Sequence, residues 1–451
     1  MKSTYDLIVI GAGPGGYVTA IRAAQLGKQV AIIEKFNAGG TCLNVGCIPS
    51  KTLLEHGTKV HDIQTARAWG IQSSDLSLDV KQLTSRKSQV VQTLTGGVKQ
   101  LLKKNKVTYI EGEAQLHKDL HVEVNGDTLK AKDIVLATGS RPFIPPIQGL
   151  DKVDFDTTDT FFDMKKLPKS LAVIGGGVIA TELASSMADL GVEVTIVEVA
   201  KDILLTEIDE VRALLKAHLE SQGIRIITQA NIEKVTKDKI HLASDEPIHF
   251  DQLLVATGRK PNVALAEALN LKREEQWIQV DEHFQTSVKH LYAIGDLIPG
   301  YQLAHVASAQ GVYVAEHLAG QQPHPVNEDQ VARCIYTRLE AASVGLSEAQ
   351  AQERGYTVKV TTSKFQGNAK ALIKGEAEGF VKLVIDTQYQ EILGAFIVGP
   401  HATDLIGEIL GVMASEGTVN ELSDVIQPHP ALLEGIGESA DSYFNKAIHE
   451  F

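Results

Sequence analysis

Residues 5–16 read YDLIVIGAGPGG, an apolar run that passes directly into a glycine-rich turn. The run has the length and composition of a buried strand. A helical stretch follows, and after it a second apolar run at residues 29–34 (QVAIIE) ends in an acidic residue. A strand, a tight glycine turn, a helix and a second strand with a terminal acid form the pattern of a dinucleotide-binding βαβ unit.

The same pattern returns 164 residues later. Residues 171–180 read LAVIGGGVIA, a helical stretch follows, and residues 193–198 read EVTIVE. In both copies the terminal acid lies 23 positions after the first glycine, at Glu34 and at Glu198. One glycine motif alone is often a simple turn, but two copies in the same context predict two nucleotide-binding domains.

Each position of the motif has a physical role. The first glycine permits the turn, the second lets the backbone approach a pyrophosphate, and the third allows close packing of helix on strand. The free N–H groups and the dipole of the helix N-terminus attract phosphates, and the terminal acid accepts hydrogen bonds from a ribose. The predicted binding residues are Gly11, Gly13, Gly16 and Glu34 in the first copy, and Gly175, Gly177, Ala180 and Glu198 in the second.

Two cysteines lie inside the first copy, in residues 39–51 (GGTCLNVGCIPSK). Each copy ends in an Ala-Thr-Gly segment, in residues 134–142 (IVLATGSRP) and 253–261 (LLVATGRKP). The first copy takes 128 residues from its first glycine to this last one, and the second copy takes 83. The cysteine segment and a helical stretch predicted from residue 51 to about residue 104 account for the difference.

The spacing of Cys42 and Cys47 limits what the pair can do. A disulfide needs Cα atoms within roughly 7 Å, whereas residues five apart on a regular helix lie about 8–9 Å apart. The segment must therefore be a loop or a distorted turn, which Asn44 and Gly46 permit. Pro49 suits the first turn of a helix, so Cys47 would lie near a helix N-terminus, where thiolates are stabilised. This favours a reducible disulfide over a zinc site, which needs about four ligands, and over two small buried residues.

Composition narrows the class of protein. The 451 residues are 22% charged with a formal net charge of −13, which disfavours nonspecific nucleic-acid binding. Three cysteines cannot form a structural disulfide framework in a chain of this length, so a reducing compartment is expected. No apolar stretch approaches the roughly 20 residues of a membrane span, and the first strand begins too early for a leader peptide. We expect a cytoplasmic protein with neither a nucleic-acid nor a membrane partner.

Taken together with residues 292–296 (YAIGD) and 427–430 (QPHP), these motifs resemble those of the FAD-dependent pyridine-nucleotide disulfide oxidoreductases. The resemblance covers essentially the whole chain. It implies an α/β fold with two Rossmann-like dinucleotide-binding domains, a central domain and a C-terminal α+β dimerisation domain. The implied boundaries are 1–141 for the FAD domain, 142–262 for the NAD domain, 263–329 for the central domain that completes the FAD site, and 330–451 for the dimerisation domain.

The resemblance also implies cofactor contacts. Lys51 would lie near the flavin and pair with Glu182, and Asp296 would bind the ribitol and pyrophosphate of FAD. The implied FAD residues are Gly11, Gly13, Gly16, Glu34, Lys51, Ala114, Asp296 and Ala304; the implied NAD residues are Gly175, Gly177, Ala180, Glu182, Glu198, Ile232 and Gly258. Since a carboxylate at Glu198 repels a 2′-phosphate, NAD is favoured over NADP. No metal is implied.

The catalytic residues implied are Cys42 as the interchange sulfur, Cys47 as the thiolate against the flavin, and His429 as a base contributed by the partner subunit. Glu434 would orient His429. The expected reaction is the oxidation of protein-bound dihydrolipoamide with reduction of NAD⁺, in a homodimer that serves a lipoylated acyltransferase (E2) or another lipoyl-carrier protein. Such an enzyme is the E3 component of a 2-oxoacid or acetoin dehydrogenase complex or of the glycine cleavage system.

Other readings remain. A glutathione-reductase-like enzyme would need arginines after the second acidic strand, and a mercuric reductase would need a further cysteine pair near the C-terminus; neither is present. A noncatalytic flavin-binding scaffold would not need both cysteines. The chain departs from the family pattern at Leu339, Gln427 and Pro428, and Cys334 is expected to be a small buried residue.

Overall fold

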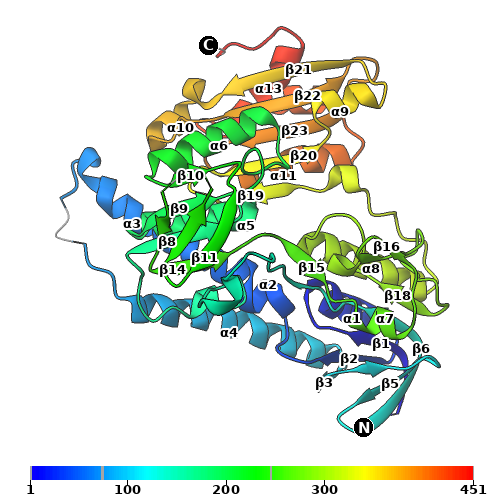
Figure 1. Cartoon of the computed structure of the whole chain (residues 1–451). Helices are drawn as coiled ribbons and strands as arrows, with labels where there is room; N and C mark the ends of the chain where they lie inside the picture. Colours follow the sequence, from blue (N-terminus) through cyan, green and yellow to red (C-terminus); the bar gives the residue numbers. More distant parts are fainter. Residues whose placement is uncertain (1–2, 73–75, 244–245, 450–451) are drawn as a thin grey trace. The chain divides into compact units, whose positions relative to one another are not determined.

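The structure is a computed structural model, and it describes residues 3–72, 76–243 and 246–449. The chain forms two compact units (Figure 1). The first unit comprises residues up to 53 together with 75–167 and 253–326, and the second comprises 54–74, 168–252 and the chain from 327 onward. Each unit is described by itself below. The division into four domains stays a prediction.

The first unit is built on a seven-stranded sheet in the order β3-β2-β1-β6-β5-β4, with β18 beside β6. Its strands are β1 (Thr4–Ile10), β2 (Val30–Glu34), β3 (Thr108–Glu111), β4 (Gln115–Leu116), β5 (His121–Val124), β6 (Asp127–Leu136) and β18 (Leu291–Ala293). The pairs β1–β2, β1–β6, β2–β3 and β6–β18 are parallel, and β4 and β5 are antiparallel. Because β18 comes from the predicted central domain, that segment contributes directly to the FAD-domain sheet.

Both faces of β1 are buried, as a parallel sheet covered on each side requires. Leu7 and Val9 face a cluster that includes residues of three helices, and Ile8 and Ile10 face a second cluster on the other side. The helices on the first face are α1 (Pro14–Gln25), α4 (Val80–Lys104) and α8 (Ala304–Leu318), visible beside the sheet in Figure 1. The second face is covered by α7 (Ala264–Ala268) and by the short pair β16 (Arg273–Glu274) and β17 (Trp277–Ile278).

The insert in the first copy is not one helical stretch. It consists of α2 (Gly40–Val45), α3 (Cys47–Thr65), the 3₁₀ turn η1 (Ala66–Trp69) and α4. The expectation of a continuous helical stretch from residue 51 to about 104 was therefore wrong. Gly70 takes a left-handed conformation (φ 76°) that ends the first run, and Asp79 accepts a hydrogen bond from the Gln82 N–H that begins α4.

The second unit contains the second glycine motif. Three parallel strands, β8 (Ser170–Ile174), β9 (Glu193–Val197) and β10 (Arg225–Ile227), are accompanied by α5 (Val178–Asp189) and α6 (Asp209–Ser221). An antiparallel sheet follows, made of β11 (Ile232–Thr236), β12 (Lys239–Leu242) and β13 (Ile248–His249). Strand β14 (Gln252–Val255) crosses the boundary between the units.

The C-terminal part of the second unit is an antiparallel sheet in the order β19-β20-β23-β22-β21. All seven residues of the central β23 are buried. The strands are β19 (Arg333–Ile335), β20 (Ala341–Gly345), β21 (Val358–Lys364), β22 (Phe380–Asp386) and β23 (Ile392–Val398), and the helices are α9 (Glu348–Glu353), α10 (Ala369–Lys374), α11 (Ala402–Ala414), α12 (Val419–Asp424) and α13 (Glu434–Tyr443). Across the described residues, no helix is both long enough and apolar enough to cross a bilayer.

Candidate functional site

Cys42 and Cys47 lie on either side of a break between two helices. Cys42 belongs to α2, Cys47 is the first residue of α3, and Gly46 between them has φ −132° and ψ −112°. A Cβ at Gly46 would lie 3.0 Å from the carbonyl oxygen of Thr41. The Asn44 amide fixes the preceding turn by donating to the Gly40 carbonyl at 2.8 Å. The distorted turn expected from the spacing of the cysteines is confirmed.

The two thiols interact directly. Neither cysteine forms a disulfide in this structure. A hydrogen bond with Cys47 raises the pKa of Cys42, burial and the charge of Cys47 raise it further, and the charge of Lys51 acts in the opposite direction. Cys42 therefore keeps its proton, which favours Cys47, at the positive end of the α3 dipole, as the thiolate of the pair.

The cysteine segment is packed directly onto the first glycine turn. The N–H of Gly39 donates to the Ala12 carbonyl at 2.8 Å. Gly40 follows with φ 56°, and a Cβ at Gly40 would lie only 2.6 Å from the Cα of Gly13. The start of the cysteine segment is thus anchored on the turn that is predicted to hold a pyrophosphate.

The glycines of the first motif are required for different reasons. Gly11 has φ 103°, and a Cβ there would lie 2.3 Å from the Ala137 carbonyl oxygen. A Cβ at Gly16 would lie 1.9 Å from the carbonyl oxygen of Gly11, which is the predicted close packing of helix on strand. At Gly13, among the described residues, a Cβ would meet only the Cα of Gly40 at 3.9 Å. Space therefore remains at the N-terminus of α1, and these residues fit the pyrophosphate of FAD.

The two terminal acids are held in the same way. Glu34 is 8% exposed and accepts hydrogen bonds from the N–H groups of Ala12 at 2.7 Å and Phe36 at 2.9 Å. Glu198 accepts from the N–H groups of Gly176 at 2.5 Å and Ala200 at 2.7 Å. Each carboxylate oxygen still has a lone pair that can accept from a ribose hydroxyl, so each acid is positioned for the role expected of it.

The second motif repeats this geometry with one change. Gly175 has φ 113°, and Gly177 precedes α5 as its N-cap. Among the described residues, no heavy atom lies within 4 Å of a Cβ built on Gly177, so this turn is open like the first. The third position is Ala180, whose side chain is fully buried. The second motif thus fits the pyrophosphate of a nicotinamide dinucleotide.

Asp296 is held by two residues that were not predicted from the sequence. The hydroxyl of Ser140 donates to Asp296 at 2.5 Å, and the guanidinium of Arg259 donates to the Ser140 hydroxyl at 2.7 Å and to its carbonyl at 2.8 Å. Ser140 and Arg259 each follow one Ala-Thr-Gly segment, and their strands, β7 (Ser140–Pro142) and β15 (Arg259–Pro261), pair antiparallel. The repeated Ala-Thr-Gly segment was the signal that could have drawn attention to both.

The other expected cofactor residues lie at ends of elements. Ala304 is the first residue of α8, and Ala114 lies just before β4, packed against the sheet core. Ile232 is the first residue of β11, and Gly258 has φ 101° after β14. Their cofactor contacts stay predictions.

Lys51 and Glu182 belong to different units, and their pairing stays a prediction. Lys51 lies on α3. Glu182 is 3% exposed on α5 and accepts a hydrogen bond from the Tyr336 N–H at 3.0 Å. A buried carboxylate with this backbone bond is held in a fixed position on the helix of the second motif.

His429 and Glu434 lie together, as the sequence led us to expect. Nδ1 of His429 lies 2.8 Å from Glu434, the first residue of α13, which also accepts from the Ala431 N–H at 2.8 Å. Burial opposes ionisation of Glu434, but the bonds from Ala431 and His429 outweigh it, and the pKa of Glu434 is lowered. The carboxylate of Glu434 is placed to accept the Nδ1–H, which in the neutral ring leaves the lone pair on Nε2, and the His429 side chain is 71% exposed.

Two of the residues that depart from the family pattern make specific hydrogen bonds. The amide of Gln427 donates to Glu408 on α11 at 2.7 Å, which fixes the chain just before His429. Leu339 is buried, and its carbonyl accepts from the Thr337 hydroxyl at 2.6 Å. Cys334 was expected to be buried but is only partly so, at the margin of the C-terminal core.

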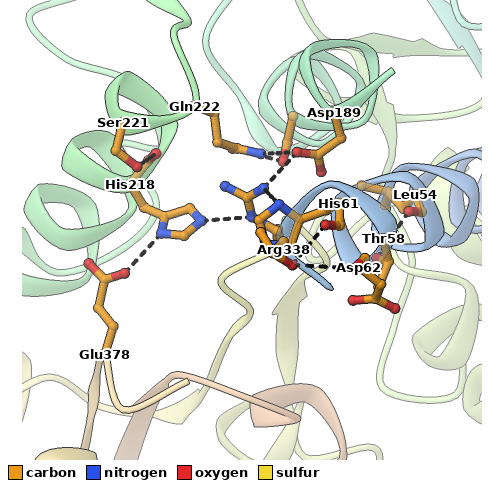
Figure 2. Close-up of polar contacts among 12 residues, drawn as sticks. Leu54, Thr58, His61, Asp62, Asp189, His218, Ser221, Gln222, Arg338 and Glu378 are labelled. Carbon is orange, nitrogen blue, oxygen red and sulfur yellow. Dashed lines mark hydrogen bonds and ion pairs between the residues drawn. The ribbon is translucent and has the colours of Figure 1, made fainter. Parts of the chain in front are cut away.

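Figure 2 shows a polar cluster around Arg338 that was also not predicted. Its guanidinium donates to Asp189 at 2.8 Å and to Nδ1 of His61 at 2.6 Å, and its Nε donates to Nε2 of His218 at 3.4 Å. His218 in turn contacts Glu378 at 2.9 Å. Both histidines must present an unprotonated nitrogen to the arginine. Burial, followed by the charge of Arg338, lowers the pKa of His61.

Comparison with known protein families agrees with this geometry. Residues 5–311 match the model described as pyridine nucleotide-disulphide oxidoreductase, and residues 331–440 match the dimerisation domain of the same family. The chain belongs to this family. The predicted family, fold class and cofactors, FAD and NAD, are confirmed.

Individual members of the family match the chain over its full length. A dihydrolipoyl dehydrogenase of Bacillus subtilis is 40% identical over 473 residues, covering 100% of both chains, and one of Zymomonas mobilis is 40% identical over 465 residues, again covering 100% of both. Among solved structures, LpdA from Mycobacterium tuberculosis has a TM-score of 0.90 at 25% identity, covering 97% of this chain and 99% of LpdA. The HOCl-induced flavoprotein disulfide reductase RclA from Escherichia coli has a TM-score of 0.86 at 28% identity, covering 97% and 99%.

Proposed function

We propose that this chain oxidises protein-bound dihydrolipoamide to lipoamide and reduces NAD⁺, the activity named for its full-length relatives. The observation that carries the proposal is the placement of Cys42 and Cys47 across a helix break that is anchored on the first glycine turn. A scaffold that only binds nucleotides would not need a dithiol at the turn that we propose holds the flavin cofactor.

The cysteines exchange electrons with the substrate through sulfur chemistry. In the oxidised enzyme a thiolate of dihydrolipoamide attacks the sulfur of Cys42, which breaks the Cys42–Cys47 bond and releases Cys47 as a thiolate. The second thiolate of the substrate then attacks the substrate sulfur bonded to Cys42. Lipoamide leaves with its ring disulfide closed, and Cys42 leaves as a thiolate that takes a proton. The raised pKa of Cys42 favours this assignment of the proton.

This chain holds residues for both cofactors. When bound, FAD would supply the two-electron redox chemistry that links the dithiol to NAD⁺. The residues that would hold FAD are the first glycine motif with Glu34, and Asp296 through its bond to Ser140. The residues that would hold NAD⁺ are the second motif with Glu198. Because backbone N–H groups fix the Glu198 carboxylate, a 2′-phosphate would meet a negative charge that cannot turn away.

His429 would take the first proton from the substrate dithiol. Its Nε2 is free for this because Glu434 accepts the Nδ1–H. We propose that each His429 serves the cysteine pair of the partner subunit in a homodimer, which is consistent with the family dimerisation domain at residues 331–440 and with the exposure of the ring in the single chain. The lipoyl group would arrive on another protein, and the reducing cytoplasm remains the predicted location.

The test is a steady-state assay of purified holoenzyme with dihydrolipoamide, with NAD⁺ and NADP⁺ compared as acceptors. Rapid reduction of NAD⁺ alone is expected. Reduction of another disulfide by NADH or NADPH, without turnover of dihydrolipoamide, would keep the redox pair but replace the substrate. A second measurement dilutes the enzyme until the dimer dissociates. Activity that survives in the monomer would show that His429 does not act across subunits.

A further inference from the structure

A hairpin at the edge of the first sheet brings three potential metal ligands onto one face. Strands β4 and β5 pair antiparallel with Leu116 opposite Val122. The His117 N–H donates to the His121 carbonyl at 3.0 Å, so these two residues are the next cross-strand pair. Side chains of such a pair lie on the same face, and Glu123, two residues beyond His121, shares that face. Leu116 and Val122 are buried on the opposite face.

The side chains converge. The rings of His117 and His121 stack with their centroids 4.1 Å apart and their planes 8° from parallel. Nε2 of His117 lies 3.4 Å from one oxygen of Glu123, and Nε2 of His121 lies 3.4 Å from the other. One ligand atom from each residue falls within 4.8 Å of the others. The ligand atoms of tetrahedral zinc lie roughly 3.3–3.5 Å apart, given bonds of about 2.0–2.2 Å, so small side-chain rotations would close the site.

A second carboxylate prepares His121 to act as a ligand. Nδ1 of His121 lies 2.5 Å from a carboxylate oxygen of Asp119. A carboxylate at this distance accepts the Nδ1–H, which in the neutral ring leaves the lone pair on Nε2, the atom that lies 3.4 Å from Glu123. Histidines that bind metals are usually oriented by a carboxylate in this manner.

His117 supplies an independent observation. Its Nε2 has essentially no solvent exposure and finds no hydrogen-bond partner among the described residues, since its 3.4 Å contact with Glu123 does not form one. A buried ring nitrogen without a partner is costly. A cation between the two rings and the carboxylate would satisfy it.

We propose that His117, His121 and Glu123 bind a divalent transition-metal ion of the Zn²⁺ type, with water completing the coordination. Two imidazoles and one carboxylate are a ligand set that zinc uses in proteins. The ion would cross-link the two strands β4 and β5 of the hairpin that begins just after Ala114. It would take no part in the thiol chemistry. The sequence alone predicted no metal here, because the cross-strand register that unites the ligands is not visible in it.

The test is equilibrium dialysis of tag-free holoenzyme against Zn²⁺. The oxidised form is used, so that Cys42 and Cys47 are not available as ligands. We expect one Zn²⁺ per chain, with at least tenfold weaker binding in His117→Gln and in Glu123→Gln. Asp119→Asn removes no ligand and should weaken binding about 10–100-fold.

His449→Gln is the matched control. Nδ1 of His449 also contacts a carboxylate, that of Glu438 at 2.7 Å, but among the described residues this pair has no third ligand. This variant should bind Zn²⁺ as the parent does. An unchanged flavin spectrum and melting temperature without metal would show that each variant is folded. The proposal is overturned if the parent binds no Zn²⁺ at millimolar concentration, or if His117→Gln and Glu123→Gln bind it as tightly as the parent.

Discussion

The two glycine turns of this chain share their geometry and differ in what is attached to them. Both are followed by a helix of 12 residues, α1 and α5, and both hold a glutamate through two backbone N–H groups at equivalent positions. The nucleotide-binding geometry is therefore a local property of a repeated sequence. It does not depend on the rest of the unit in which each turn lies.

In each turn an equivalent backbone carbonyl binds the segment that follows the acidic strand. The Ala12 carbonyl in the first turn accepts from the N–H of Gly39, and the equivalent Gly176 carbonyl in the second accepts from the N–H of Leu204 at 2.9 Å. Gly39 leads into the cysteine helices, whereas Leu204 leads toward α6. One anchoring point thus carries a redox segment in one copy and an ordinary connection in the other, which separates electron exchange from nucleotide binding.

The largest effect on activity should come from a substitution in the cysteine segment that is anchored on the first glycine turn. Cys47→Ser removes the thiolate of the redox pair, so oxidation of dihydrolipoamide should fall by on the order of 10³-fold or more. Reduction of an artificial acceptor by NADH requires only the two cofactors, so it should persist. Loss of both activities together would mean that the substitution had damaged nucleotide binding, and the proposed separation would fail.

Substitutions at the third motif position should have unequal effects in the two turns. Gly16→Ala places a Cβ 1.9 Å from the Gly11 carbonyl oxygen and should cost about 3 kcal/mol or more, with loss of FAD. Ala180→Gly only loosens a buried helix position, at about 0.5–1 kcal/mol, and should retain FAD. Flavin content and melting temperature measure both effects. Equal losses in the two variants would contradict the packing argument.

The two glutamates provide a matched pair. Glu34→Gln and Glu198→Gln each place an amide donor against a backbone N–H, at about 1–3 kcal/mol. Glu34→Gln should lower FAD retention and leave the affinity for NAD⁺ of the remaining holoenzyme unchanged. Glu198→Gln should raise the KM for NAD⁺ at normal flavin content and narrow the preference over NADP⁺. The assignment of cofactors to turns is wrong if the effects are exchanged.

The effect on dihydrolipoamide turnover should be smallest at the ends of the two motif helices, where substitutions act on stability alone. The last residue of α1, Gln25, is exposed, whereas the last residue of α5, Asp189, is buried against Arg338 (Figure 2). Arg338→Met should cost roughly 2–3 kcal/mol, less than for a fully buried pair because Gln222 still donates to Asp189. The melting temperature measures this, and Arg22→Met on α1, a partly exposed pair with Glu316, is the control with the smaller loss.

The same cluster predicts a pH dependence. The pKa of His61 is lowered in the folded chain, so the unfolded chain binds more protons as the pH falls below about 6.5. Stability should therefore decrease on acidification from that point down to the lowered pKa. The pKa of His61 also responds to the charges of Asp62, Asp189 and His218, which remain when Arg338 is replaced. The substitution removes only the contribution of the Arg338 charge. The slope should be shallower in Arg338→Met, and an unchanged slope would contradict this assignment.

The sequence predicted what local patterns determine. The strands β1, β2 and β9 lie within one residue of their expected bounds, because short apolar runs that end in glycine or acid define them. The distorted turn at Gly46 followed from the reach of a disulfide. These features depend on neighbours along the chain.

Features that join distant residues could not be predicted. Ser140 and Arg259 meet through the pairing of β7 with β15, and His117 faces His121 through a hairpin register. The break between α3 and α4 was missed because the turn at Gly70 and the cap at Asp79 outweigh the helical propensity around them. In each case the deciding interaction is tertiary or conformational, and residue spacing carries little information about it.

The central claim is that the Cys42–Cys47 pair passes electrons from dihydrolipoamide to NAD⁺. The most direct measurement follows the visible spectrum of the holoenzyme while dihydrolipoamide is added without NAD⁺, and then after NAD⁺ is added. A long-wavelength band from a thiolate against the flavin should appear, then decay as NADH forms, and Cys47→Ser should show neither change. NADH formation in Cys47→Ser at the parent rate, or no reaction of the parent with dihydrolipoamide, would contradict the account.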